Sequence, residues 1–182
     1  MALTRIGLNQ SINLATNITG TLATGNGGTG ATSFAPGKIG QIVTAQPVTS
    51  SFATSNTSYT DVTNLNASIT PTAASSKVLV MVYLQLYTSG ATQGNTARLQ
   101  LLRGSTVVNS FQASHYDQGG SGVQGANTCT MTFLDSPSSS SSVTYKVQIK
   151  KQEGSSATLQ ASATNSGSGE STPTFTLLEV LA

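Results

Sequence analysis

The residues best suited to chemistry lie side by side at positions 115–117. His115, Tyr116 and Asp117 are contiguous, and a histidine oriented by a carboxylate is the pair that activates a serine nucleophile. The chain has many serines but no Gly-x-Ser-x-Gly sequence to place one of them. An aromatic ring beside polar groups also suits contact with carbohydrate or protein. We therefore predict a surface contact for these three residues in preference to catalysis.

Metal, cofactor and acid–base chemistry find little support in the sequence. The chain has one histidine, one cysteine and six acids, and these acids show neither the spacing of metal ligands nor a pairing for glycoside hydrolysis. We predict no catalytic residue, no metal and no cofactor. The six acids are Asp61, Asp117, Asp135, Glu153, Glu170 and Glu179.

Cys129 has no partner cysteine for a disulfide within the chain. It alternates with threonines and falls in phase with Met131 and Phe133. We predict that it is a small buried apolar residue on a strand.

The low charge and the short apolar runs of the chain argue against nucleic acid and membrane as partners. Only 8% of the residues are charged, with a net charge of +2, and the basic residues are scattered. This pattern does not favour nucleic acid as a partner. No secretory signal precedes the polar start, and the longest apolar run, residues 78–84, is too short to cross a membrane as a helix. Low charge offers little protection from self-association, so the surface suits an assembly.

The first 37 residues differ from the rest of the chain. Their apolar residues are sparse and separated by polar ones, so this segment cannot bury a core of its own. Gly25-x-Gly27-x-x-Gly30 has the letters of a dinucleotide-binding loop but lacks the strand before it and the helix after it. Together with Ala35-Pro36-Gly37 it predicts a hinge. We predict an extended anchoring or trimerisation arm over 1–37, whose assembly residues are Leu3, Ile6, Leu8, Ile12, Leu14, Ile18 and Leu22.

From Lys38 onward, short apolar or alternating segments are separated by polar turns. Residues 143–150 alternate strictly, which predicts a strand with one buried face, whereas 78–84 is apolar throughout and predicts a strand covered on both faces, by the sandwich and by a partner subunit. Arg103-Gly104-Ser105 predicts a hairpin turn. The fold class is all-β: a β-sandwich or jelly-roll-like knob over 38–182, preceded by the arm. Strands are expected at 41–44, 59–62, 65–69, 78–87, 97–102, 106–111, 128–134, 143–149, 157–161 and 175–181.

The connecting segments are rich in Gly, Ser and Asn and nearly free of charge. Flexible connection is the favoured interpretation, and a binding rim is the alternative. These loops are expected at 89–96, 118–127, 136–142 and 162–172.

Several segments together resemble bacteriophage virion fibre proteins, particularly those of marine phages and cyanophages. Residues 13–22 and 25–34 are similar to the repeated linker of such fibres, and residues 58–62, 65–70, 75–80, 101–105 and 174–180 are similar to the β-rich terminal module that follows it. The resemblance implies a homotrimeric knob, with the strand containing Val78 or the C-terminal strand near the threefold axis. Tail fibres are commonly much longer than this chain.

The sequence therefore predicts a non-enzymatic virion structural protein, assembled in the host cytoplasm. Its expected partners are copies of itself, other tail or capsid proteins, and a host surface glycan or protein, but neither nucleic acid nor membrane. Two alternatives stay open: a capsid decoration or cement protein that stabilises the head, and a free carbohydrate-binding module.

Overall fold

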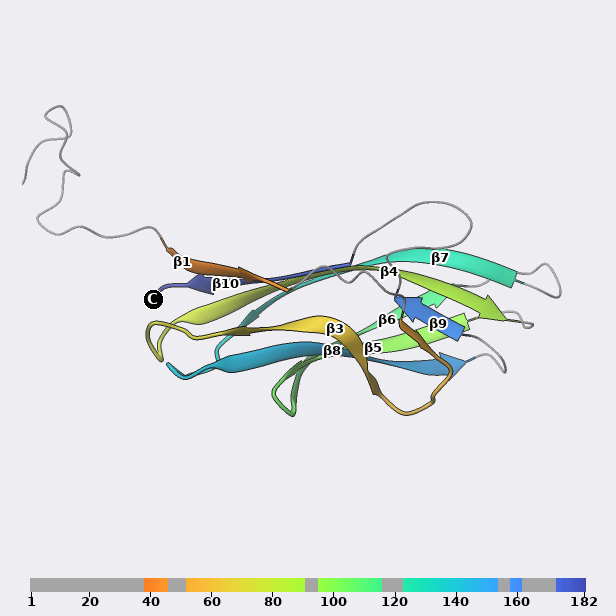
Figure 1. Cartoon of the computed structure of the whole chain (residues 1–182), viewed down its shortest axis with the longest axis horizontal. Coiled ribbons are helices and arrows are strands. Elements are labelled where there is room, and N and C mark those ends of the chain that lie inside the picture. The colour runs from red at the N-terminus through yellow and green to blue at the C-terminus, as the bar shows by residue number, and fades with distance from the viewer. Residues whose placement is uncertain (1–37, 46–51, 91–94, 116–122, 154–157, 162–172) are drawn as a thin grey trace, which may run out of the picture. The chain divides into compact units, whose positions relative to one another are not determined.

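The computed structural model describes residues 38–45, 52–90, 95–115, 123–153, 158–161 and 173–182. Within these ranges every regular element is a strand, and the strands form two antiparallel sheets. The predicted all-β sandwich is confirmed (Figure 1).

The first sheet, here called sheet A, is organised around one long strand, β4 (Lys77–Gly90). Along one edge, β4 pairs with β7 (Val123–Asp135) over its whole length from Val78. Along the other edge it pairs first with β10 (Thr174–Val180) and then with β9 (Thr158–Ala161). Short strands complete the sheet, with β1 (Ile39–Thr44) beside β10 and β2 (Phe52–Thr54) beside β9.

The second sheet, sheet B, has the order β3-β8-β5-β6. Its strands are β3 (Thr60–Ile69), β8 (Val143–Glu153), β5 (Asn95–Arg103) and β6 (Thr106–His115). The predicted turn between β5 and β6 is confirmed, and Gly104 takes a φ of 58°, which glycine adopts without steric cost. Residues 60–69 form one strand where two, at 59–62 and 65–69, were predicted, with an irregularity that includes Asn64 at a φ of 62°.

One hydrophobic core lies between the sheets. Alternate residues of each strand point into it, as the strict alternation in β8 predicted: Tyr145, Val147 and Ile149 are fully buried. Sheet A contributes alternate residues of β4 together with Phe175 and Leu177. Cys129 is buried on β7 as predicted, next to Met131.

The inner face of β4 is buried in the core and its outer face is partly exposed: Val78, Val80 and Val82 are buried, whereas Met81 is 44% exposed. The predicted cover of the outer face by a partner subunit stays a prediction. The expected bounds of two loops were wrong. The predicted loops at 89–96 and 118–127 are shorter than expected, because β4 continues to Gly90 and β7 begins at Val123. Backbone hydrogen bonding between neighbouring strands does not depend on apolar side chains, so polar residues extend this ladder. The short strand β2 was not predicted.

Candidate assembly surface

A row of four apolar residues crosses the outer face of sheet A. Residues opposite each other in neighbouring strands point to the same face, and the register pairs Ile42 with Leu178, Leu178 with Leu79, and Leu79 with Leu134. The row thus passes from β1 through β10 and β4 to β7. Its outer members are well exposed, Ile42 at 61% and Leu134 at 46%.

Further apolar residues extend this row along the strands. Met81 lies two residues beyond Leu79 on the same face, followed by half-buried Tyr83, and Ile39 pairs with Val180 on the other side. We call this surface the apolar face: Ile39, Ile42, Leu79, Met81, Tyr83, Leu134, Leu178 and Val180.

Apart from Lys77, the described positions of the outer face between and beside these apolar residues are uncharged. The next row consists of Thr44, Thr176, Met81 and Thr132, and Tyr83 lies between Thr174 and Thr130. Among the described residues of this face, Lys77 at the start of β4 is the charged one, and it lies opposite Val180. From Leu79 to Tyr83 the face therefore offers methyl and hydroxyl groups without a formal charge.

The outer face of sheet B has the opposite character. Asp61, Gln148 and Gln100 form a row across β3, β8 and β5, in which the Gln100 Nε2 donates to Gln148 Oε1 at 2.6 Å and the Gln148 Nε2 donates to Asp61 Oδ1 at 2.6 Å. Lys146 bridges to the same carboxylate at 2.9 Å, and these hydrogen bonds lower the pKa of Asp61. This polar face consists of Asp61, Ser68, Arg98, Gln100, Thr144, Lys146, Gln148 and Lys150.

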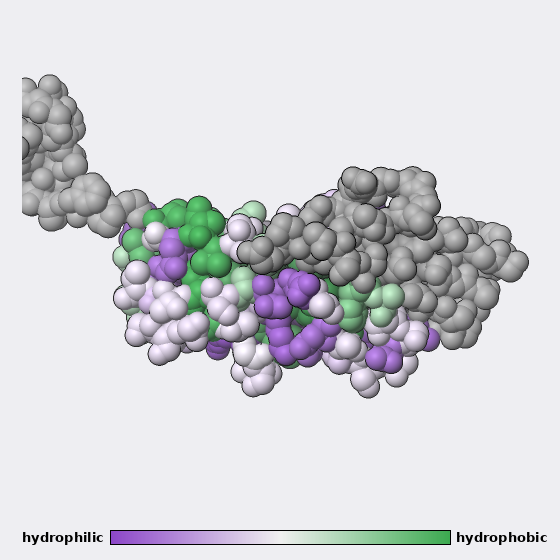
Figure 2. Space-filling model, in the orientation of Figure 1, coloured by the Kyte–Doolittle hydropathy of each residue, from purple (hydrophilic) through white to green (hydrophobic). Residues whose placement is uncertain are grey.

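Figure 2 shows the same contrast: hydrophobic residues gather over β1 and β10, and hydrophilic residues lie over β3 and β8. A sandwich that presents both outer faces to water normally carries polar side chains on both. The asymmetry marks sheet A as the side suited to a protein contact.

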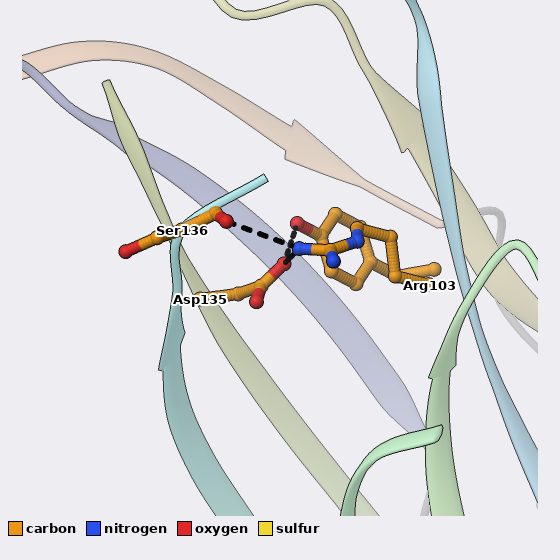
Figure 3. A network of polar contacts seen from close by, with 4 residues as sticks. Arg103, Asp135 and Ser136 are labelled. Carbon is orange, nitrogen blue, oxygen red and sulfur yellow. Dashed lines mark hydrogen bonds and ion pairs between the residues drawn. The ribbon is translucent and has the colours of Figure 1, made fainter. Parts of the chain in front are cut away.

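A polar network ties the two sheets together at one end of the core. Asp135 of β7 accepts hydrogen bonds from Arg103 Nη1 at 2.8 Å and from the Tyr145 hydroxyl at 2.6 Å, and Arg103 also donates to the Ser136 carbonyl (Figure 3). Asp135 is 7% exposed and Tyr145 is fully buried. Burial and the neighbouring carboxylate both raise the pKa of Tyr145 above its ordinary value. Because the acid is already bound by two donors, the arrangement is suited to joining sheets.

A second buried carboxylate, Glu179 of β10, holds β1 and the β3–β4 connection together. Its Oε1 accepts from the Thr72 amide at 2.6 Å and the Thr72 hydroxyl at 2.7 Å, and its Oε2 accepts from Gln41 Nε2 at 2.9 Å. The Gln41 amide also donates to the Thr70 carbonyl. Burial acts to raise the pKa of Glu179, but hydrogen bonds from Gln41, Thr72 and Ser76 outweigh it and lower the pKa to about 2.

Most of the predicted site residues lie outside the part of the chain that the structure describes. The arm residues Leu3, Ile6, Leu8, Ile12, Leu14, Ile18 and Leu22 lie outside the described residues, as do Tyr116 and Asp117. The backbone of His115 ends β6, where it pairs with Asn95. The contact role of these residues remains a prediction.

Sequence reasoning missed both buried acids, and of the apolar face it predicted only that a partner subunit covers residues 78–84. A signal for the acids was present: Glu179 continues the phase of Phe175 and Leu177, and Asp135 continues that of Cys129 and Met131. The face is harder to find, because its members come from four strands whose register the sequence does not provide.

Three further kinds of feature were considered among the described residues: a metal site, a reactive cysteine and a membrane-spanning helix. No group of three or more potential metal-ligating side chains occurs there. Burial raises the pKa of the Cys129 thiol to about 11. No helix long and apolar enough to span a membrane is found among these residues.

No protein-family model matches the chain, and no curated protein matches its sequence significantly. Solved structures with some similarity are capsid proteins of infectious bursal disease virus. The VP2 subviral particle gives a TM-score of 0.34 at 11% identity, covering 78% of this chain and 37% of that one. A mutant VP2 from T=1 particles gives 0.34 at 12% identity, covering 78% and 36%, and the Gx strain structure gives 0.30 at 11% identity, covering 78% and 42%. This chain thus spans about two-fifths of their length, and TM-scores in this range do not establish kinship.

Proposed function

We propose that this chain is a non-enzymatic structural protein of a virion. Residues 38–182 form the knob of a trimeric fibre or spike, and residues 1–37 form the arm that attaches the knob to the particle. The observation that carries the proposal is the one-sided body: an apolar face on sheet A, charged among its described residues only at Lys77, lies opposite a polar, charged face on sheet B.

The roles of the buried acids are consistent with this proposal. Asp135 and Glu179 both accept hydrogen bonds that join elements of the fold. The resemblance to phage fibre linkers and terminal modules supplies the virion context. In a fibre knob, the loops near His115 and Tyr116 would face a host surface glycan or protein.

A capsid decoration or cement protein is the alternative that the one-sided body also supports, since such a protein covers one face on a shell and exposes the other. A free carbohydrate-binding module is less well supported, because a monomer would leave the apolar face in water.

The decisive experiment removes the arm. Particles are assembled in cells that supply either the full chain or a chain lacking residues 1–24, and the purified particles are probed for the protein. We expect the truncated chain to be absent from particles while its circular dichroism still shows a folded β protein. Normal incorporation of the truncated chain would rule out the arm as the attachment segment.

Labelled electron microscopy of particles containing the full chain then separates the two virion roles. A fibre knob predicts label on the tail, and a decoration protein predicts label over the head. Absence of the full-length protein from purified particles would refute both roles.

A further inference from the structure

We infer that the apolar face of sheet A is the surface through which copies of this chain pack against one another. The inference deepens the proposed function, on which it rests for the need to assemble, by naming both the surface and its occupant. The occupant is another copy of the same face.

The chemistry of the face favours a copy of itself over a charged partner. From Leu79 to Tyr83 the face holds no charged side chain. A partner that brought charges to it would lose their hydration without gaining an ion pair. A second apolar face brings only methyl groups, hydroxyls and an aromatic ring to the same contact, and two sheets pack in this way in β-sandwiches.

The size of the face also suits such a contact. Ile39, Ile42, Met81 and Leu134 are 49%, 61%, 44% and 46% exposed, which corresponds to roughly 400 Å² of residue surface, within the range of the largest apolar patch on a typical monomer, a patch that is often functional. A standard interface buries about 800 Å² on each partner and is little more than half apolar. The threonines between the apolar rows supply uncharged surface for the polar part of such an interface.

Covalent continuity brings the faces of neighbouring copies together. The predicted arm, residues 1–37, leads directly into β1, whose Ile39 and Ile42 belong to the face. Copies gathered by their arms would therefore hold their apolar faces at a high effective concentration, so that even a modest contact would form.

The other exposed apolar residue of comparable size provides a matched control. Val107 on β6 is 50% exposed, but it belongs to sheet B, beside the hairpin turn. Substitutions at Val107 change exposure and polarity as substitutions on the apolar face do, without touching that face.

The first test measures association of the full chain. Sedimentation velocity over a range of concentrations compares the wild type with Leu134→Lys and Val107→Lys, and circular dichroism checks each fold. We expect Leu134→Lys to weaken association at least about 100-fold, because a lysine would be buried without a partner, and Val107→Lys to change it by less than about threefold. If Leu134→Lys does not fold, Ile42→Thr, at the most exposed position of the face, replaces it.

The second test detects contact even where the arms alone hold copies together. Met81→Cys and Val107→Cys are treated at low micromolar concentration with a short bis-maleimide crosslinker, to which the buried Cys129 thiol responds poorly because of its raised pKa. We expect covalent dimers from Met81→Cys and few from Val107→Cys. A wild type that stays monomeric, or equal crosslinking at the two positions, would overturn the inference.

The outcomes separate this inference from the proposed function. Crosslinking at position 81 in a protein that never enters particles would refute the virion role and support the interface. Incorporation into particles without crosslinking at position 81 would support the virion role and refute the interface. Sedimentation of the wild type as a dimer in place of a trimer would support the interface and refute the threefold symmetry.

Discussion

Replacing Glu179 with glutamine should weaken the attachment of β1 to the body. Glu179 is fully buried, and its two oxygens accept three hydrogen bonds from Thr72 and Gln41. Glutamine has nearly the same size but turns one acceptor into a donor, which then faces another donor. Hydrogen bonds to a charged group contribute about 1.5–3 kcal/mol each. With one bond lost and the others no longer charge-assisted, we expect Glu179→Gln to lower the free energy of unfolding by about 3 kcal/mol.

Thermal unfolding followed by circular dichroism measures this loss at one fixed protein concentration. A domain of this size loses about 2–4 °C of Tm per kcal/mol, so Glu179→Gln should lower Tm by roughly 10 °C at pH 7. Asp61→Asn is the control, because Asp61 is likewise a carboxylate that accepts side-chain hydrogen bonds, but its side chain is 55% exposed. Exposed pairs contribute less than about 1 kcal/mol.

The pH dependence gives an independent check on the same residue. The pKa of Glu179 lies at about 2 in the folded protein, below its ordinary value of 4.5. Its contribution to stability is therefore fully present above pH 4.5 and is lost as the pH falls toward 2. The Tm difference between wild type and Glu179→Gln should shrink over this range. A constant difference, or a loss in Asp61→Asn as large as that in Glu179→Gln, would refute the assignment.

Two further substitutions test the packing around these networks. Gly40→Ala would place a Cβ 2.8 Å from both Glu179 Oε2 and Leu181 Cδ2, so we expect a loss of about 1–3 kcal/mol in chemical denaturation, and an unchanged midpoint would mean that β1 adjusts without cost. Tyr145→Phe removes the hydroxyl that donates to Asp135 at 2.6 Å. We expect it to cost about 1–2 kcal/mol, measured by urea unfolding, and a more stable variant would contradict a structural role for this hydrogen bond.

Much of the fold could be predicted because the order of apolar and polar residues within a strand indicates which of its side chains are buried. In β8 the alternation of Tyr145, Val147 and Ile149 with polar residues states directly which face is inside. The turn at Gly104 was equally local, since a glycine between two β-rich segments is enough to indicate it. Such features depend on residues close together in the chain.

The parts that escaped prediction depend on pairing between distant segments. The row from Ile42 to Leu134 exists only because β10 lies between β1 and β4 and because the register aligns Leu178 with Leu79. The apolar run around Leu79 predicts a strand covered on both faces, the outer one by a partner subunit. Its inner face is buried in the core, and the cover of its outer face stays a prediction. The arm and the predicted contact residues at 116 and 117 stay predictions.

The position of β1 has a mechanical consequence for any particle that carries this protein. A pull along residues 1–37 would enter the body at Lys38, whose carbonyl accepts a hydrogen bond from the Leu181 amide at 2.7 Å. The force would next reach Gln41, held by Glu179, before it reached any core residue. The resistance of the attachment to tension would then be set by a six-residue edge strand and one buried carboxylate. Under load, β1 would peel away from β10 and lengthen the tether while the rest of the sandwich stayed folded.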